Sequence, residues 1–583
     1  MKPCKLAICA TIAMLFAACN DFLDDNRFPL DQQVDSPEYW NNPVNVEAQL
    51  NELYGYYMGY GNGASWVNDF YYRSLSDNQC AEILSGTGVT FSQWKYQMTP
   101  ETNSDWDDAY KAVRKCNTII IRVGESVLPG SAKQRFLGVA RLNRAYQYWQ
   151  LVRCFGDVPL VETILDPGDE ALYGQRTNRN IVMNFVLSDL DYAIENIDIQ
   201  SSKTQFSKDM ATAMKSEICL FEASYAKYHS NDTERSNKYF AEVIEACTPL
   251  MQSYSLCDNY RSLYNSTRNS DVARGFVSLG DNPEVIIMKT YEQSVLGHSM
   301  LKYLSSNTPI AGMTKDAFDA YLFKDGKPKA LTAENNSDKA VTDSDDRLSI
   351  ISALAVRDKR LSQTIDPYLA FNGNLWARNN SDPLSSVTGY TINKFINPNM
   401  SYAESTIDGA GFTCAPIFWL ARIYLNYAEA RAELGLLDDN DLNNTINRLY
   451  VRADLPKQTL ASLSEMNDPD NDMDISSLLW EIRRCRRCEL MFDSYTRYWD
   501  LVRWKQLHLL DTTRNPDIAL GANVSNASSD MTKSIIVRNG YIDAAASSNG
   551  TYTRTFTERE YLYPIGSTQL TLNKKLTQNP GWK

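Results

Sequence analysis

One stretch of the chain combines aromatic rings and glycines with side chains that hydrogen-bond to sugars. Residues 55–75 read GYYMGYGNGASWVNDFYYRSL. Aromatic rings stack on the apolar face of a sugar ring, while carboxamides, carboxylates and guanidinium groups bind its hydroxyls. No strand precedes this stretch and no P-loop lysine follows it, so it is not typical of a phosphate-binding loop. It predicts a carbohydrate-binding loop, and an irregular surface loop is the alternative that the sequence leaves open.

The candidate ligand-binding residues follow from ring chemistry and from loop position. The first loop supplies five of them: Asn62, Trp66, Asp69, Tyr72 and Arg73. Further rings expected in the pocket stand before the next predicted helix, after a predicted strand and in a later polar stretch: Trp94, Tyr291, Tyr303 and Trp376. The chain has 34 Tyr, 20 Phe and 11 Trp. This surplus of rings favours a ligand with a planar or ring-shaped surface.

Histidine and cysteine give little support for metal or nucleophile chemistry. The three histidines, His229, His298 and His508, stand far apart in the sequence. Nine of the twelve cysteines remain after the N-terminal segment, and they are scattered over apolar faces. We expect them to be buried free thiols. The pair Cys485-x-x-Cys488 lies within a helical stripe and lacks the second pair that a structural zinc site needs.

Four alternating aspartates resemble the start of a calcium-binding loop: Asp468, Asp470, Asp472 and Asp474. The sixth position of such a loop is normally Gly and the twelfth Glu, but here they are Met473 and Leu479. An acidic surface loop is therefore expected, and no metal or cofactor. No motif marks a pair of carboxylates as those of a glycoside hydrolase, so the protein is not expected to be an enzyme.

The N-terminus predicts export and lipid attachment. Lys2 and Lys5 precede an apolar run over residues 6–18, which is too short to span a bilayer. LFAAC, residues 15–19, is typical of a lipobox, in which Cys19 receives a diacylglycerol. Residues 1–18 are predicted to be a signal peptide, and residues 19–43 a lipidated tether to the membrane. An ordinary secretory signal is the alternative.

The charge of the chain excludes one class of partner. Its formal net charge is −13 at pH 7. Nucleic-acid phosphates require clustered Lys and Arg, so no nucleic-acid partner is expected.

Helical patterns dominate the rest of the sequence. Apolar residues at helical spacing predict helices at these ranges: 44–60, 106–123, 131–155, 180–196, 208–228, 236–251, 416–434, 442–451 and 478–504. Small residues alternate with Tyr, Leu and Phe, as in nested tetratricopeptide-like units. The predicted fold is mainly α, with a tetratricopeptide-like helical scaffold and a large irregular, loop-rich ligand-binding half. A single domain is predicted over 44–583, with its frame at about 44–254 and 416–510 and insertions at about 255–415 and 511–560.

Residues 478–504 carry the longest apolar stripe. Eight apolar or aromatic residues lie along one helical face: Leu478, Ile482, Cys485, Cys488, Phe492, Tyr495, Trp499 and Val502. We interpret this face as packed against the core, and Arg497, Asp500 and Arg503 as polar groups that hold the frame together from inside.

Several blocks, spread over nearly the whole chain, match one family. They are Phe22-Leu23-Asp24 after Cys19, the stretches 141–146 and 151–161, Asp358-Lys359-Arg360, residues 426–430 and 448–455, Asp500 to Trp504, and Gln578-Asn579-Pro580-Gly581-Trp582. With these motifs the chain resembles SusD/RagB-type nutrient-binding outer-membrane lipoproteins. It departs from the usual pattern at Cys485 and at Asp493-Ser494, where the local turn geometry is open.

The resemblance implies a lipid-anchored protein on the outer face of the outer membrane of a Gram-negative bacterium. Its partner would be a SusC-like TonB-dependent transporter, and its ligand an oligosaccharide captured for uptake. A peptide-binding lid of a TonB-dependent peptide importer is the second function that the resemblance allows. No catalysis, cofactor or obligatory metal is implied.

Overall fold

The computed structural model of the chain describes most residues from 36 to the C-terminus. The described residues are 36–57, 59–63, 83–85 (backbone only), 94–198, 202–265, 277–300, 302, 311–370, 386–397, 400, 401, 404, 406–493, 496–533, 535–544, 546 and 554–583.

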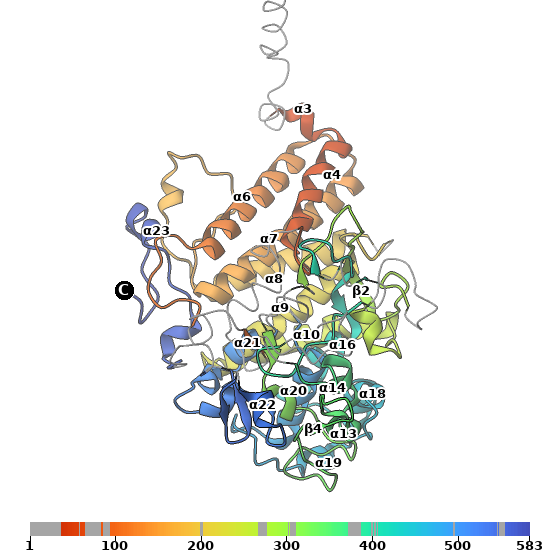
Figure 1. Cartoon of the computed structure of the whole chain (residues 1–583). Coiled ribbons are helices and arrows are strands. Elements are labelled where there is room, and N and C mark those ends of the chain that lie inside the picture. Colours follow the sequence, from red (N-terminus) through yellow and green to blue (C-terminus); the bar gives the residue numbers. More distant parts are fainter. Residues whose placement is uncertain are drawn as a thin grey trace, which may run out of the picture.

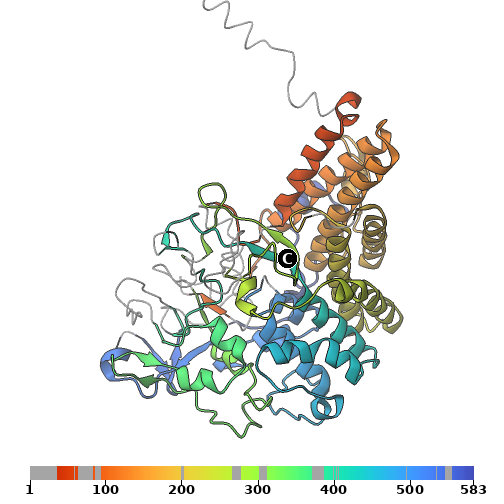
Figure 2. The same ribbon diagram turned by 90° about the vertical axis from the view of Figure 1, so that its right-hand side faces the viewer.

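A stack of long helices forms one side of the molecule. From α6 to α10, each helix packs against the next one in the chain. Helix α16 then packs against both α10 and α20, which extends the stack. Figures 1 and 2 show these helices as a curved wall. The long members are α6 (Ser104–Glu125), α7 (Gly130–Phe155), α8 (Arg179–Asn196), α9 (Lys208–Tyr228), α10 (Thr233–Ser253), α16 (Leu420–Glu433) and α20 (Ser477–Glu489). The predicted mainly α, tetratricopeptide-like scaffold is confirmed.

Residues whose side chains are good N-caps, Asn and Ser, stand at the N-cap positions of two of these helices. The Asn103 side chain accepts a hydrogen bond from the Asp105 amide at the start of α6, and Ser207 does the same for the Met210 amide at α9. Each cap binds one of the amides that a helix start leaves without an intrahelical partner.

The short helical segments join and cover the long ones. They are α3 (Pro37–Trp40), α4 (Pro43–Asn51), η1 (Glu52–Tyr56), η3 (Glu170–Tyr173), η4 (Tyr260–Leu263), α12 (Lys315–Asp319), α13 (Ile351–Ala355), α14 (Lys359–Thr364), α17 (Asp439–Asn444), α18 (Ile446–Arg452), α19 (Leu460–Ser464), α21 (Thr496–Arg503), η6 (Leu507–Leu510), η7 (Pro516–Ala519), α22 (Ser529–Thr532), η9 (Glu558–Tyr561) and α23 (Ser567–Leu572).

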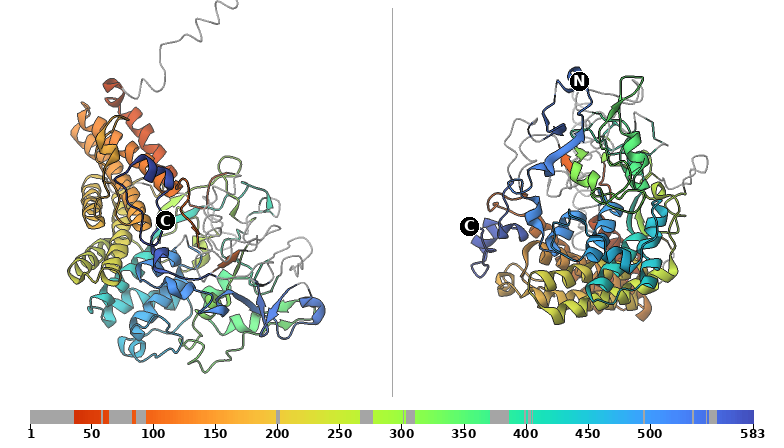
Figure 3. Two further views of the ribbon diagram at one scale, coloured as in Figure 1. Left: turned by 90° about the vertical axis from the view of Figure 1, so that its left-hand side faces the viewer. Right: turned by 90° about the horizontal axis from the view of Figure 1, so that it is seen from below.

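Short antiparallel strands and loops lie on the other side, facing the helical wall (Figures 2 and 3). Strand β2 (Val285–Lys289) pairs with β6 (Ala415–Trp419), which leads directly into α16. The other strands are β1 (Ile83–Ser85) with β3 (Ala311–Met313), β4 (Val341–Thr342) with β5 (Leu348–Ser349), and β7 (Leu520–Asn523), β9 (Tyr541–Asp543) and β8 (Val537–Arg538) in that order. This half has its own smaller apolar core, which includes Phe318, Leu348 and Tyr390.

Four predicted helices are interrupted or shortened in the structure. The predicted helix 442–451 is divided between α17 and α18 at Thr445, and the predicted helix 44–60 ends as the 3-10 helix η1 at Tyr56. Residues 416–419 of the predicted helix 416–434 belong to β6, because they pair with β2 before α16 begins. The predicted helix 478–504 is two helices, α20 and α21. Between them Phe492 has a φ of +64°, a left-handed conformation that an α-helix does not contain.

Buried ion pairs connect the helices of the wall. A carboxylate oxygen of Glu429 lies 2.7 Å from Nη1 of Arg503, and the Arg486 Nε lies 2.8 Å from an Asp500 oxygen. The prediction that Asp500 and Arg503 hold the frame from inside is confirmed, since both side chains are buried.

Candidate ligand-binding site

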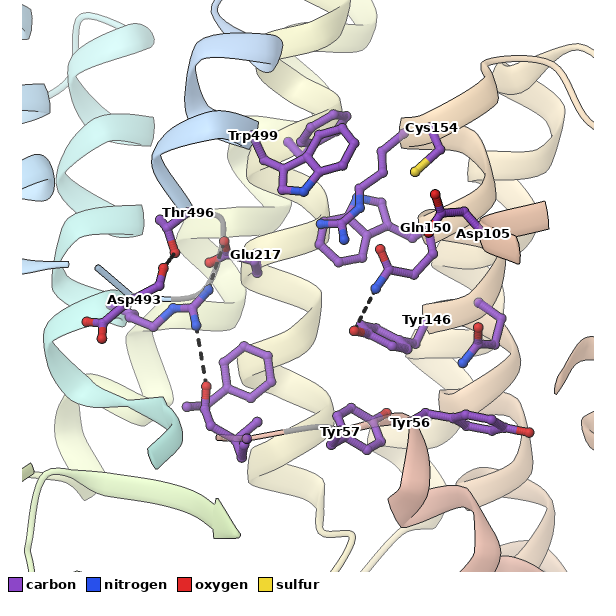
Figure 4. A pocket seen from close by; sticks show the side chains of 18 of the residues that line it. Tyr56, Tyr57, Asp105, Tyr146, Gln150, Cys154, Glu217, Asp493, Thr496 and Trp499 are labelled. Atoms are coloured by element: carbon purple, nitrogen blue, oxygen red, sulfur yellow. Dashed lines mark hydrogen bonds and ion pairs between the residues drawn. The ribbon is translucent and has the colours of Figure 1, made fainter. Parts of the chain in front are cut away.

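A cavity of about 630 Å³ lies where the helical wall meets the loop-rich half. Most of its lining comes from residues 55–57 and 59–62, the start of α6, one face of α7 with the facing side of α9, the β6–α16 junction, and Phe492 and Asp493 with α21. Single residues from other parts of the chain complete it: Lys95, Met300, Phe395 and Tyr563. Figure 4 shows Tyr146, Gln150, Asp105 and Cys154 on one side of it and Asp493 and Thr496 on the other.

Helix α7 contributes a row of four side chains to this cavity. Tyr146, Trp149, Gln150 and Arg153 recur at intervals of three and four, so they share one face of the helix. The Gln150 amide nitrogen donates a hydrogen bond of 2.6 Å to the Tyr146 hydroxyl. Helix α7 packs on α6 and α8, which fixes the direction of this face.

Arg153 is held between two indole rings. Its guanidinium carbon lies 4.4 Å from the centroid of the Trp149 ring and 4.3 Å from that of Trp499. Its Nε is buried and has no hydrogen-bond partner among the described residues. A guanidinium stacked in this way keeps its planar edge available for a ligand.

The turn before α21 forms the opposite wall. The carboxylate of Asp493 lies 3.2 Å from Lys394 Nζ and accepts a 2.7 Å hydrogen bond from the Tyr264 hydroxyl. Burial raises the pKa of Asp493, although Lys394 and Tyr264 lie against it. Thr496 donates its hydroxyl proton to the Asp493 carbonyl, a contact drawn in Figure 4.

A second guanidinium reaches the cavity from α16. Arg422 Nη2 lies 3.0 Å from the Glu217 carboxylate on α9, and Arg486 lies 3.4 Å from the same group. Burial alone would raise the pKa of Glu217, but Arg422 and Arg486 outweigh it and bring the pKa to about 2. Glu217 is therefore an ion-pair partner and not a proton donor at neutral pH.

Residues 55–57 and 59–62 close one end of the cavity, where two tyrosines, Tyr56 and Tyr57, line it (Figure 4). The path of residues 59–62 is fixed by Tyr291, whose hydroxyl accepts a 2.8 Å bond from the Tyr60 amide and donates a 2.7 Å bond to the Gly61 carbonyl. Gly59 has a φ of +56°, and a Cβ there would lie 3.0 Å from the Tyr291 hydroxyl oxygen, so a larger residue would be strained.

Comparisons with known proteins decide the family. A model of the SusD family matches residues 283–582. A second model, described as "Starch-binding associating with outer membrane", matches residues 21–220. The chain belongs to the SusD family. The resemblance predicted from the sequence motifs is thereby confirmed, and with it membership of a starch- and glycan-binding family associated with the outer membrane.

Individual SusD-like relatives are distant. A SusD-like protein of Bacteroides ovatus is 29% identical over 296 residues, which are 48% of this chain and 50% of that protein, so the match spans half of its length. SusD-like protein P38 of Formosa agariphila is 24% identical over 426 residues, 70% of this chain and 73% of that protein. A crystal structure described as a SusD-like carbohydrate binding protein of Bacteroides fragilis superposes with a TM-score of 0.66 at 19% identity, covering 92% of this chain and 100% of that one. The structural likeness shows a common SusD-like fold.

The predicted ligand residues of this SusD-family chain fall into three groups. Asn62 lines the cavity, and its carboxamide oxygen accepts a 2.6 Å hydrogen bond from Lys289. Trp94 and Tyr291 are buried: the Trp94 indole donates to the Thr555 carbonyl at 2.8 Å, and Tyr291 orients the 60–61 turn. Because their rings are enclosed by protein, they support the walls and offer no open face to a sugar. The others lie outside the described residues: Trp66, Asp69, Tyr72, Arg73, Tyr303 and Trp376, with the lipidation candidate Cys19.

The α7 face and Trp499 were not among the predicted ligand residues. Trp499 was interpreted as part of the packed stripe of 478–504, and it does pack on Phe221 with ring centroids 6.3 Å apart. It nevertheless reaches the cavity. The signal for the α7 face was its mixture of rings and hydrogen-bonding groups at helical spacing, which differs from a purely apolar core face.

The described residues contain no group of three or more His, Cys, Asp or Glu arranged to hold a metal ion. Asp468 of the aspartate-rich loop instead accepts hydrogen bonds from the Trp480 indole at 3.1 Å and from Arg484. The eight cysteines that the structure describes are buried free thiols, as predicted. Over the same part of the chain, no helix has both the length and the apolar character that crossing a bilayer requires.

Proposed function

We propose that this chain is a cell-surface lipoprotein that captures an oligosaccharide in the cavity between α7 and α21. It delivers the sugar to a SusC-like TonB-dependent transporter of the outer membrane, and Cys19 carries the lipid that anchors it there. Membership of the SusD family supports the class of ligand and the membrane association. The transporter partner follows from the family resemblance.

The composition of the cavity wall is the observation that carries the proposed ligand. The lining combines the rings of Tyr56, Tyr146 and Trp499 with the amide of Gln150 and the guanidinium of Arg153. Ring faces bury the apolar side of a pyranose, and the polar groups bind its hydroxyls. The volume of about 630 Å³ falls in the usual range for a small-molecule site.

The same wall supports binding without catalysis. Hydrolysis of a glycosidic bond needs one carboxyl group that gives up a proton and a second that is free to attack or to activate water. Glu217 has a pKa of about 2 and pairs with Arg422, while Asp493 is held by Lys394 and Tyr264. The other three carboxylates of the lining, Asp105, Asp108 and Asp500, are also paired with lysine or arginine, which favours neither role.

A binding screen of the soluble protein, residues 20–583, against plant and host oligosaccharides tests this proposal. Isothermal titration calorimetry should find saturable binding of at least one oligosaccharide, with weaker binding in a Trp499→Ala variant. A parallel panel of unstructured peptides covers the second candidate function. Binding of peptides with no binding of any oligosaccharide would overturn the glycan proposal.

A test of the anchor is independent of the ligand. Cys19→Ala should remove acyl-chain labelling of the protein and release it from the membrane fraction. Cys4→Ala, within the predicted signal peptide, is the matched control and should leave both unchanged. Retention of the acyl label in Cys19→Ala would contradict the proposed anchor.

A further inference from the structure

The charges that line the cavity are almost fully paired. Each of its five carboxylates has a cationic nitrogen within 3.2 Å: Asp105 with Lys95, Asp108 with Lys111, Glu217 with Arg422, Asp493 with Lys394, and Asp500 with Arg486 and Arg503. Charges neutralised in this way contribute little net field to a ligand.

Arg153 differs from the other cations of the lining. Lys95, Arg422 and Arg503 each face a carboxylate. Among the described residues, no carboxylate oxygen lies within 4.0 Å of the Arg153 nitrogens. Its polar contact is the thiol of Cys154, and burial raises the pKa of this thiol to about 12, so it is uncharged at neutral pH. Among the residues that the structure describes, one positive charge of the wall therefore has no anion beside it.

The surroundings of Arg153 prepare it to bind an anion. Trp149 and Trp499 cover the two faces of the guanidinium, which restricts its motion and shields it from bulk water. An ion pair in a site with little water is stronger than one on the open surface. The exposed edge of a guanidinium fits the two oxygens of a carboxylate in a bidentate hydrogen bond.

Tyr146 and Gln150 line the same cavity as Arg153 and could bind the hydroxyl groups of an acidic sugar. Tyr146, Arg153 and Arg422 all line the cavity. Burial raises the pKa of Tyr146, and the positive charges of Arg153 and Arg422 oppose that increase. Since the Tyr146 hydroxyl accepts a hydrogen bond from Gln150, its own proton can be donated to a ligand. A bound acid would meet Arg153 and Tyr146 at its carboxylate, with the Gln150 carbonyl oxygen beside its hydroxyls.

We propose that the cavity selects oligosaccharides that carry a carboxylate, as uronic acid residues do, and that Arg153 is the residue that binds this group. The inference rests on the proposed glycan capture and specifies its ligand class. Arg153 would place the carboxylate between the two indoles, and the pyranose ring would lie along Trp499 and Tyr146. A neutral sugar would gain no ion pair with Arg153, so it should bind more weakly than the corresponding acid.

The test compares uronate-containing oligosaccharides with the same molecules after reduction of their carboxylates to alcohols. Oligogalacturonides, alginate-derived oligosaccharides and glucuronoxylan fragments, each with its reduced counterpart, are titrated by calorimetry into residues 20–583. We expect at least one acidic form to bind tenfold or more tightly than its reduced form. The preference should decrease at high salt, because an ion pair is screened.

Variants at Arg153 assign the preference to this side chain. Arg153→Gln should bind acidic and reduced forms alike, with the affinity that the wild type has for the reduced form. Arg153→Lys, which keeps the charge but not the planar fork, should retain part of the preference. Arg122→Gln removes a half-exposed arginine of α6 outside the cavity and should behave as the wild type. Melting curves of all three verify the fold.

The outcomes separate this inference from the proposed function. Equal affinity for acidic and reduced forms in every pair, or a preference that Arg153→Gln retains, overturns the role of Arg153. If only other, neutral glycans of the screen bind, glycan capture stands and the acidic ligand class is wrong. Binding of peptides alone overturns both proposals.

Discussion

The guanidinium carbon of Arg153 lies 4.3 Å from the centroid of the Trp499 ring. The two residues are 346 positions apart in the sequence, on α7 and α21. Their contact joins α7, near the N-terminal end of the helical wall, to α21 on the opposite side of the cavity. In the proposed complex, the sugar would lie against this contact.

Trp499→Ala should weaken oligosaccharide binding. The change removes one face of the Arg153 stack and a ring of the cavity wall, and we expect a loss of about 2 kcal/mol, or roughly thirty-fold in Kd. Calorimetry with the best ligand of the screen measures it. Tyr173→Ala, at a partly exposed ring of η3 away from the cavity, is the control and should bind as the wild type. Unchanged affinity in Trp499→Ala would exclude this wall as the site.

The Glu429–Arg503 pair should make stability depend on acid pH. Burial alone would raise the pKa of Glu429, but Arg503 outweighs it and lowers the pKa to about 2. Because the folded pKa lies below the unfolded value of about 4.3, the stabilisation is complete above that value and is lost as the pH falls towards 2. Denaturant unfolding between pH 3 and 7 should show this decline.

Glu429→Gln removes that titration. It removes one of the two carboxylates that pair with the buried Arg503 and leaves Asp500 as the other. We therefore expect a loss of about 3 kcal/mol in the free energy of unfolding at pH 7 and a weaker dependence on pH below 5. Glu125→Gln at the exposed end of α6 is the control, with an expected change below about 0.5 kcal/mol. A variant as stable as the wild type at pH 7 would contradict the role of the pair.

His229 should add a second dependence on pH at milder acidity. Burial lowers its pKa to about 4, and its ring stacks on Tyr225 with centroids 4.1 Å apart. Since the unfolded pKa is about 6.5, neutral His229 stabilises the fold above pH 6.5, and this contribution declines as the pH falls towards 4. An NMR titration of the ring should find it neutral at pH 5.5. A protonated ring at that pH would refute the expectation.

Gly521→Ala should destabilise the loop-rich half. A Cβ at this position of β7 would lie 2.2 Å from the Thr388 carbonyl oxygen, so the backbone would have to move. We expect a cost of about 1–3 kcal/mol. Gly124→Ala in α6 is the matched comparison, because a Cβ there meets nothing within 4 Å. That variant should be more stable by about 0.5–1 kcal/mol in thermal or urea unfolding.

The helical frame was readable from the sequence because its signals are local. Spacing and turn residues placed α7 at 131–155 and α9 at 208–228, against 130–155 and 208–228 in the structure. The break between α20 and α21 was not readable, because it depends on the left-handed Phe492 and not on a Gly or Pro. The strand at 415–419 was missed for a related reason: its partner β2 lies 130 residues earlier, and pairing at that distance leaves no local pattern.

The candidate site was predicted only in part. Asn62 is in the cavity, but Trp94 and Tyr291 are enclosed by packing that a sequence does not reveal. Nothing in the local sequence marks Arg153 or Trp499 as a ligand-binding residue. They come together only because α21 packs close to α7 in the fold. Loop residues chosen by chemistry could be named in advance, whereas a site formed between two distant helices required the fold.

The most direct test of the account is a crystal structure of residues 20–583 with the tightest-binding oligosaccharide of the screen. The account predicts a sugar ring in the cavity between α7 and α21, stacked on Trp499, with an acidic group at the Arg153 guanidinium. An oligosaccharide bound elsewhere on the molecule, with this cavity filled by water, would contradict it.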